Sequence, residues 1–138
     1  MKKESIAVLI KRLELKSERV TASHLKELDL SVAQYRILLI LLHHQGQPLR
    51  QRDIEARLGL TNPTVTGLVQ KLEVGGWIHR VSISGDKRSK GLVVTDQAKS
   101  AQERFEQIAK KSQKEIMENL DTAERKDLRR LLEKCLEE

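Results

Sequence analysis

The run Asp86-Lys87-Arg88 carries the most specific chemistry in this sequence. It follows Ser84-Gly85, which favours a turn between two short stretches rich in Val, Ile and Thr. The pattern therefore predicts that the three charged side chains lie at the tip of a β-hairpin. An arginine at such a tip can enter a narrow groove of duplex DNA, where the crowded phosphates attract it.

The strands of this hairpin are expected at Ile78 to Ile83 and at Leu92 to Thr95. β-Branched residues favour extended backbone, and the preceding Gly75-Gly76 ends a helix because glycine readily adopts the left-handed conformation of a helix terminus. Arg80 and Lys90 add positive charge to the hairpin. Arg80 either contacts DNA or braces the hairpin, and each lysine there either contacts DNA or is a solvated surface charge.

A second set of candidate side chains lies on the helix predicted over residues 62–75. Four apolar residues recur at helical spacing and form one face: Val65, Leu68, Val69 and Leu72. The opposite face carries small and polar residues, through which a helix in the major groove reads base edges. The glycine among them would allow a close approach to the duplex. The candidate DNA-binding residues of this helix are Asn62, Thr64, Thr66, Gly67, Gln70 and Lys71.

The two threonines of this set also have a simpler explanation as ordinary residues of a helix surface. β-Branched residues are indifferent helix formers, however, so their presence in the first turns favours another use. Trp77, directly after the helix, is expected to pack in the core rather than to contact DNA.

The elements before this helix must position it. Arg50 to Leu58 predicts a short helix that Gly59 ends, and Thr61-Asn62-Pro63 begins the next helix with a polar cap and a proline in the first turn. Upstream, Ser31 is expected to cap a strongly apolar, buried helix that ends before Gly46. The predicted order is therefore helix, short turn, helix, and then the hairpin.

Apolar stripes mark helices at both ends of the chain. One helix is expected over residues 4–20, another from Thr95-Asp96 to about Asn119, and a last one after Asp121, which forms a capping box with Glu124. The segment between these ends is compact by itself, so each stripe left in water would be an exposed apolar patch. We therefore expect a homodimer in which a second copy of the chain buries the stripes.

The charge distribution favours a polyanionic partner. The 138-residue chain has a formal net charge of +6. Between Pro48 and Lys90, eight lysines and arginines face four acidic residues, which places +4 of that excess in the same stretch as the helix-turn-helix and the hairpin.

Several other functions have no candidate residues. A single cysteine, Cys135, permits neither an intrachain disulfide nor a multi-cysteine zinc site, and it is expected to pack on an apolar helix stripe. The four histidines lack metal-ligand spacing, and no nucleophile with its base indicates catalysis, so we expect neither an enzyme nor a cofactor. No apolar run approaches the roughly 20 residues of a membrane helix, and no signal-peptide pattern is present, so the protein is expected in the cytoplasm.

These residues resemble the multiple antibiotic resistance regulator (MarR) family of bacterial winged-helix transcription factors. The resemblance is strongest from Leu58 to Thr95, and Leu28 to Leu39 is similar to the start of the family's second helix. The runs that look like the family's wing signature in order and spacing are Leu72-Glu73, Gly76-Trp77-Ile78, Arg80, Asp86-Lys87-Arg88 and Leu92-Val93-Val94-Thr95.

The resemblance implies a two-fold dimer, built from the first and last helices, that binds a pseudo-palindromic operator in double-stranded DNA. Such a protein usually acts as a repressor that leaves its operator when a small molecule binds or when the protein is oxidised. The small molecule is often an aromatic anion held between the winged module and the dimer helices. By the same resemblance Arg88 enters the minor groove while Asp86 holds its guanidinium, as the planar geometry of arginine allows. Oxidation-sensing members carry a reactive cysteine near the N-terminus, where this chain has none.

The expected fold is mainly α with a small β-hairpin (α+β): a winged helix-turn-helix with dimerisation helices at both ends. We expect a single domain over 1–138, in which residues 31–95 form the DNA-binding module and residues 1–30 and 96–138 form the dimerisation helices. The alternative is a winged helix that docks protein or RNA without sequence-specific DNA binding, since a fold does not determine a function.

Overall fold

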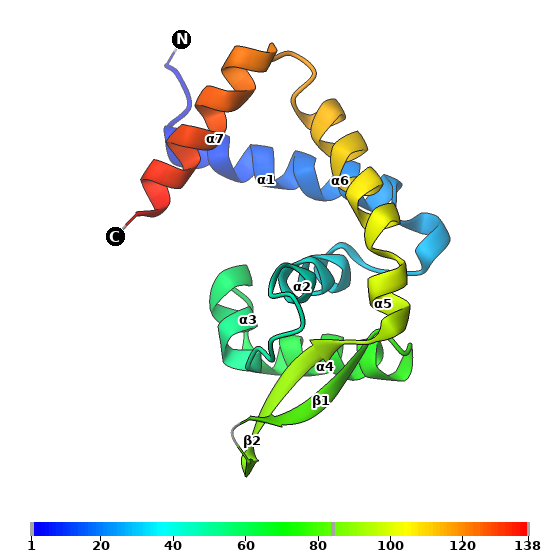
Figure 1. Ribbon diagram of the computed structural model, residues 1–138. Helices are drawn as coiled ribbons and strands as arrows, with labels where there is room; N and C mark the ends of the chain where they lie inside the picture. The colour runs from blue at the N-terminus through cyan, green and yellow to red at the C-terminus, as the bar shows by residue number, and fades with distance from the viewer. Residues whose placement is uncertain (1, 84, 138) are drawn as a thin grey trace. The chain divides into compact units, whose positions relative to one another are not determined.

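The computed structural model describes residues 2–83 and 85–137, although for 86–89 it describes the backbone and not the side chains. The elements, in chain order, are α1 (Ile6–Ser23), a 3-10 helix (Lys26–Leu28), α2 (Val32–His43), α3 (Gln51–Leu58), α4 (Asn62–Val74), β1 (Ile78–Ile83), β2 (Asp86–Val94), α5 (Asp96–Ser100), α6 (Gln102–Ile116) and α7 (Thr122–Leu136) (Figure 1). The expected class, mainly α with one small hairpin, is confirmed.

The chain forms two compact units. One comprises Met1–His24 and Ile108–Glu138, and the other comprises Leu25–Gln107. We call them the terminal-helix unit and the winged unit. The winged unit therefore includes α5 and the first turns of α6 as well as the helix-turn-helix and the hairpin.

The core of the winged unit joins α2 to the helices that follow it. Tyr35 is buried, and its hydroxyl donates a hydrogen bond to the backbone carbonyl of Phe105 at 3.1 Å. The rings of these two residues meet edge to face at 5.6 Å, and Trp77 packs against Phe105 at 5.8 Å. Around this cluster lie fully buried side chains from five elements: Ile37, Leu38, Leu41, Ile54, Val65, Val69, Leu72, Leu92 and Ala98.

The helix boundaries of the winged unit follow the expected signals. Ser31 caps α2, and with Gln34 it forms a capping box in which each side chain bonds the other residue's backbone N–H. Gly59 ends α3 with a φ of 64°, a left-handed conformation that costs glycine little. Pro63 stands in the first turn of α4 as predicted, but the expected polar cap is not formed: the hydroxyl of Thr61 donates to Oγ1 of Thr64 and caps no backbone N–H.

The hairpin is longer than expected. β1 occupies the predicted residues, but β2 begins at Asp86, whereas the prediction began it at Leu92. The strands pair antiparallel from Ile78 with Val94 to Ser82 with Lys90, and then Ile83 pairs with Asp86. The prediction was wrong because it relied on Val, Ile and Thr content, while strand pairing is made by the backbone and here also includes the polar residues Lys90 and Asp86.

The base of the hairpin is joined to the segment after α2. Leu49 and Leu92 exchange two backbone hydrogen bonds, of 3.1 and 2.8 Å, and so form an isolated antiparallel β-bridge beside the hairpin. Beside them a Cβ atom on Gly91 would lie 2.5 Å from Cβ of Pro48, so only glycine permits this close approach.

The helix expected from Thr95 to about Asn119 is divided in two and ends earlier. The first helix begins near Thr95-Asp96 as predicted, with Thr95 as its cap, but a turn at Ala101 separates α5 from α6, and α6 ends at Ile116. The N–H of Ala101 bonds the carbonyls of both Gln97 and Ala98, which marks a local tightening of the helix. Alanine is a strong helix former, so nothing in the residue types indicates this interruption.

The terminal-helix unit contains α1, most of α6, and α7. Nε2 of His24, at the end of α1, lies 2.7 Å from a carboxylate oxygen of Glu115 on α6. The predicted capping box of Asp121 and Glu124 begins α7. α1 spans Ile6–Ser23 with Ser5 as its N-terminal cap, whereas the predicted range was residues 4–20.

Large apolar side chains of this unit face outward. On α1, Ile6 is 76% exposed and Ile10 is 58% exposed, and on α7 Leu131 and Leu132 are close to half exposed. Cys135 lies on the same stripe and is exposed. The expectation that this thiol packs is therefore wrong for the single chain, because the stripe on which it lies is itself uncovered. None of the helices described combines the length and apolar character needed to cross a membrane.

Candidate nucleic-acid interface

The two faces of α4 separate as the sequence predicts. Val65, Val69 and Leu72 are buried against the winged-unit core, and Leu68 is half-buried beside them. The remaining turns point four of the predicted contact residues into solvent: Asn62, Thr64, Gln70 and Lys71. Thr66 and Gly67 lie at the border and are half-buried. α4 thus offers one continuous polar surface along a helix whose other side is anchored.

The open side of Gly67 has no neighbour. A Cβ atom placed there would meet nothing within 4 Å. Glycine is therefore not needed at this position for internal packing, and it is unfavourable within a helix. Its presence is consistent with the predicted close approach of another molecule to this part of α4.

A polar network that the sequence reasoning did not include joins α3 to α4. The carboxylate oxygen Oε2 of Glu55 accepts hydrogen bonds from the side-chain amides of Asn62, at 2.8 Å, and Gln51, at 3.1 Å. The Gln51 amide also donates to the hydroxyl of Thr66 at 2.8 Å. Two predicted contact residues are thus held by two residues of α3 that were not predicted.

One part of this network, the pairing of Gln51 with Glu55, could have been predicted from the sequence. Gln51 and Glu55 are four residues apart on one helix, a spacing at which side chains meet, but the partners on α4 become neighbours only through the turn at Gly59. The packing of α3 against α4 brings Glu55 close to Asn62, and no pattern of residues in the sequence predicts that packing.

Arg80 braces the hairpin. Its guanidinium donates to the carboxylate of Glu73 at 3.0 Å, which ties β1 to the last turns of α4. Both side chains remain about one third exposed. The structure thus shows the bracing role among the two alternatives for Arg80, and a DNA contact by the same side chain stays a prediction.

The wing residues Asp86, Lys87 and Arg88 lie on β2, at the end of the hairpin nearest the turn. Their side chains are outside the described ones, as is Ser84 of the predicted turn, so the pairing of Asp86 with Arg88 stays a prediction. The backbone register shifts between Ser82 and Ile83, so that Lys87 to Ser89 have no opposing residue on β1. Such a bulge changes the direction of a strand end, and Lys90 next to it is exposed.

In the part of the chain that the structure describes, no three His, Cys, Asp or Glu side chains gather in a group that could hold a metal ion. The interface is made instead of amides, hydroxyls, cationic side chains and one glycine. These groups can donate to phosphates and base edges, and the arrangement of α3, α4 and the hairpin is that of a winged helix-turn-helix DNA-binding protein.

Comparison with known proteins agrees with this class. Residues 28–89 match the sequence profile of the MarR family. The HTH-type transcriptional regulator PecS of Dickeya dadantii is 27% identical over 125 residues, 89% of this chain and 75% of PecS. The HTH-type transcriptional regulator SarZ of Staphylococcus saprophyticus is 31% identical over 101 residues, 73% of this chain and 68% of SarZ.

Solved structures are similar along nearly the whole chain. Wild-type MarR from E. coli in its apo form superimposes with a TM-score of 0.84 at 23% identity, covering 99% of this chain and all of that one. MepR of S. aureus in its DNA complex superimposes with a TM-score of 0.79 at 25% identity, covering 97% of this chain and 98% of that one. The chain belongs to the MarR family of transcriptional regulators.

Proposed function

We propose that this protein is a dimeric repressor that binds a pseudo-palindromic operator in double-stranded DNA. Residues 62–75 enter the major groove, and the wing over residues 78–95 reaches the adjacent minor groove. The observation that carries the proposal is the division of α4 into a buried apolar face and an exposed face of amide, hydroxyl and ammonium groups. Such a helix is fixed in orientation and free to read base edges.

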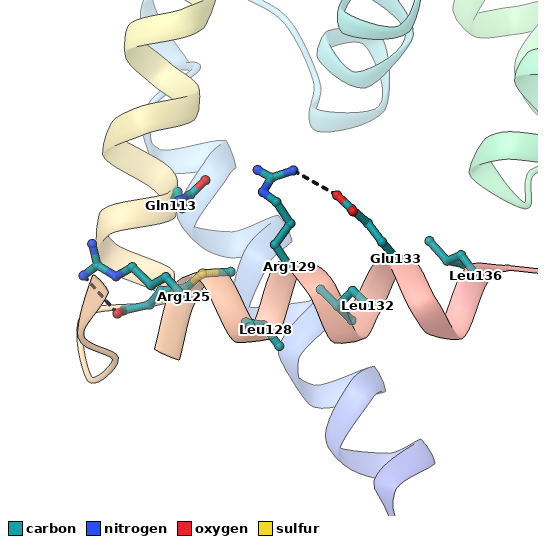
Figure 2. Close-up of a pocket in the computed structure, with 8 residues that line it drawn as sticks. Gln113, Arg125, Leu128, Arg129, Leu132, Glu133 and Leu136 are labelled. Carbon is teal, nitrogen blue, oxygen red and sulfur yellow. Dashed lines mark hydrogen bonds and ion pairs between the residues drawn. The ribbon is translucent and has the colours of Figure 1, made fainter. Parts of the chain in front are cut away.

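The dimer is supported by the outward apolar stripes of the terminal-helix unit. Leu128, Leu132 and Leu136 of α7 line an open pocket of about 190 Å³, and Gln113 of α6 and the side chains of Arg125 and Arg129 line it as well (Figure 2). A second copy of the chain would remove these leucines and those of α1 from water, and the hydrophobic effect favours that by roughly 25 cal/mol per Å² of apolar area. A two-fold dimer also places two copies of α4 on two half-sites.

Residues 1–30 and 96–138 serve dimerisation and residues 31–95 bind DNA within one functional domain. The protein works in the cytoplasm, where bacterial DNA is accessible, and it regulates transcription without catalysing a reaction. Release of the operator by a small aromatic anion is supported by the family resemblance alone.

Selection of bound duplexes from a random DNA pool at about 0.15 M salt tests the proposal, because screening then suppresses purely electrostatic binding. The expected result is an inverted repeat with half-sites about one helical turn apart. Gln70→Ala should change the selected sequence, whereas Gln102→Ala, a change of another exposed helix glutamine on α6, should not.

The absence of any enriched sequence, with binding that vanishes as salt rises, would contradict the proposal. A protein or RNA docking module would then become the leading explanation. If instead Gln70→Ala selected the wild-type sequence with unchanged affinity and Arg88→Ala had no effect, the assignment of α4 and the wing as the DNA-reading elements would be wrong.

A further inference from the structure

We infer that Glu55 sets the hydrogen-bonding polarity of the recognition helix, so that Asn62 presents an acceptor and Thr66 a donor to the bases. The inference rests on the proposed binding of duplex DNA by α4. It assigns a positioning role to a residue of α3 that itself needs no contact with DNA, and it predicts which chemical groups of the operator the two α4 residues recognise.

Asn62 is held by Glu55 in one orientation of its side-chain amide. An ionised carboxylate accepts hydrogen bonds and cannot donate them. Because Oε2 of Glu55 lies 2.8 Å from the Asn62 side chain, the atom facing it must be the amide nitrogen. The amide is planar, so its oxygen Oδ1 then points away from Glu55. Among the described residues no side chain donates to that oxygen, and Asn62 is exposed.

Thr66 is linked to Glu55 through the side chain of Gln51. Oε2 of Glu55 also lies 3.1 Å from the Gln51 side chain, which must again turn its amide nitrogen toward the carboxylate. That same nitrogen lies 2.8 Å from Oγ1 of Thr66. A side-chain amide nitrogen donates and does not accept, so the threonine oxygen accepts this bond and its hydroxyl hydrogen remains free to donate.

The carboxylate is also well placed to hold this arrangement. Asn62 is the first residue of α4, so Glu55 lies at the positive end of the helix dipole, where a negative charge is favourable. Charge-assisted bonds to a carboxylate are stronger than bonds between neutral groups. Glu55 is half-buried, which reduces competition from water for its oxygen.

The consequence is a defined choice of base groups. In the major groove the donors are the exocyclic amines of adenine and cytosine, while the acceptors are purine N7, guanine O6 and thymine O4. Asn62 should therefore recognise an adenine or cytosine amine. Thr66 should recognise an acceptor, and purine N7 is the one common to adenine and guanine.

The experiment uses the full-length protein and the operator recovered by pool selection. Each adenine of a half-site is replaced in turn by the unsubstituted purine base, which lacks the N6 amine, and each cytosine by an analogue that lacks the N4 amine. In a second series, each adenine and each guanine is replaced by its 7-deaza analogue, which lacks N7. Affinities are measured for wild type, Asn62→Ala, Thr66→Val and Glu55→Gln, with Asp53→Asn as the matched control.

In the wild type, one amine deletion and one N7 deletion should each weaken binding by about tenfold. The amine effect should vanish in Asn62→Ala, and the N7 effect should vanish in Thr66→Val. In Glu55→Gln both effects should fall by several-fold, because a glutamine amide can present either its oxygen or its nitrogen to Asn62 and Gln51. Asp53→Asn removes the same charge from an exposed position of α3 and should keep both effects at full size.

Full-size amine and N7 effects in Glu55→Gln would overturn the inference, as would an amine effect that persists in Asn62→Ala. In either case the proposed function would stand, since the operator would still be bound selectively. If the wild type selects no sequence at all, the proposed function fails, and the inference fails with it. Circular dichroism and binding to unrelated DNA show whether Glu55→Gln keeps the fold.

Discussion

The hydroxyl of Tyr35 on α2 donates to the carbonyl of Phe105 on α6 at 3.1 Å, and the two rings meet edge to face in the winged-unit core. This buried bond joins residues that are 70 positions apart in the sequence. Tyr35→Phe should lower the free energy of unfolding by about 0.5 to 1.5 kcal/mol, since it removes the donor and keeps the ring. Urea denaturation at neutral pH measures the loss.

The burial of the Tyr35 hydroxyl predicts that the stability of the protein depends on pH. Burial raises the pKa of Tyr35 above its ordinary value of 10.0. The neutral phenol therefore contributes its full stability below pH 10, and that contribution is lost as pH rises through the pKa of the folded protein. The stability difference between wild type and Tyr35→Phe should shrink above pH 10. A difference that stays constant to pH 11 would contradict the role of burial.

Gly67→Ala should have opposite effects on stability and on DNA binding. A methyl group at this position meets no neighbour within 4 Å, and alanine is favoured over glycine in a helix by about 0.5 to 1 kcal/mol. Thermal unfolding should therefore show a more stable protein. Operator affinity should fall if α4 approaches the duplex closely here. A stabilised variant with unchanged operator affinity would remove Gly67 from the interface.

The ion pair of Arg80 and Glu73 should stabilise the hairpin by a small amount. Both side chains are partly exposed, and such pairs contribute about 0.2 to 1 kcal/mol. A double-mutant cycle with Arg80→Ala and Glu73→Gln measures the coupling free energy. If Arg80 only braces the hairpin, Glu73→Gln should weaken operator binding about as much as Arg80→Ala. A larger loss for Arg80→Ala would add a direct DNA contact.

Arg88→Ala should weaken operator binding by about 1 to 3 kcal/mol while the dimer remains intact. The reason is the predicted entry of this guanidinium into the minor groove. Fluorescence anisotropy with the selected operator measures the affinity, and sedimentation measures the oligomeric state. Lys110→Ala removes one positive charge from α6 and serves as the control. Equal affinities for the two variants would refute the wing assignment.

Leu132→Glu should convert the dimer to a monomer. Leu132 is 45% exposed in the single chain, so a charge there costs little until a second copy covers it, when burying an unpaired carboxylate becomes expensive. Analytical ultracentrifugation should show the monomer, and circular dichroism should show unchanged helix content. Lys126→Glu, at an exposed position of the same helix, should leave the dimer intact. A dimeric Leu132→Glu protein would place the interface elsewhere.

The sequence alone determined the order of the elements and the faces of the helices. Ser31, Gly59 and Asp121 mark helix ends by local capping chemistry, and Pro63 marks the first turn of α4. These signals depend on a few neighbouring residues and so can be read from their types. The periodicity of Val65, Val69 and Leu72 likewise predicted which side of α4 is buried, because burial follows the helical repeat.

Tertiary structure decided what depends on contacts between distant residues. The early start of β2 and the turn at Ala101 follow from strand pairing and from packing that no local pattern encodes. The bonds of Glu55 to Asn62 and of Arg80 to Glu73 arise where the chain folds back and neighbouring elements meet at fixed angles. Residue types show which groups can form hydrogen bonds, but only the folded arrangement selects their partners and so the groups left free to meet DNA.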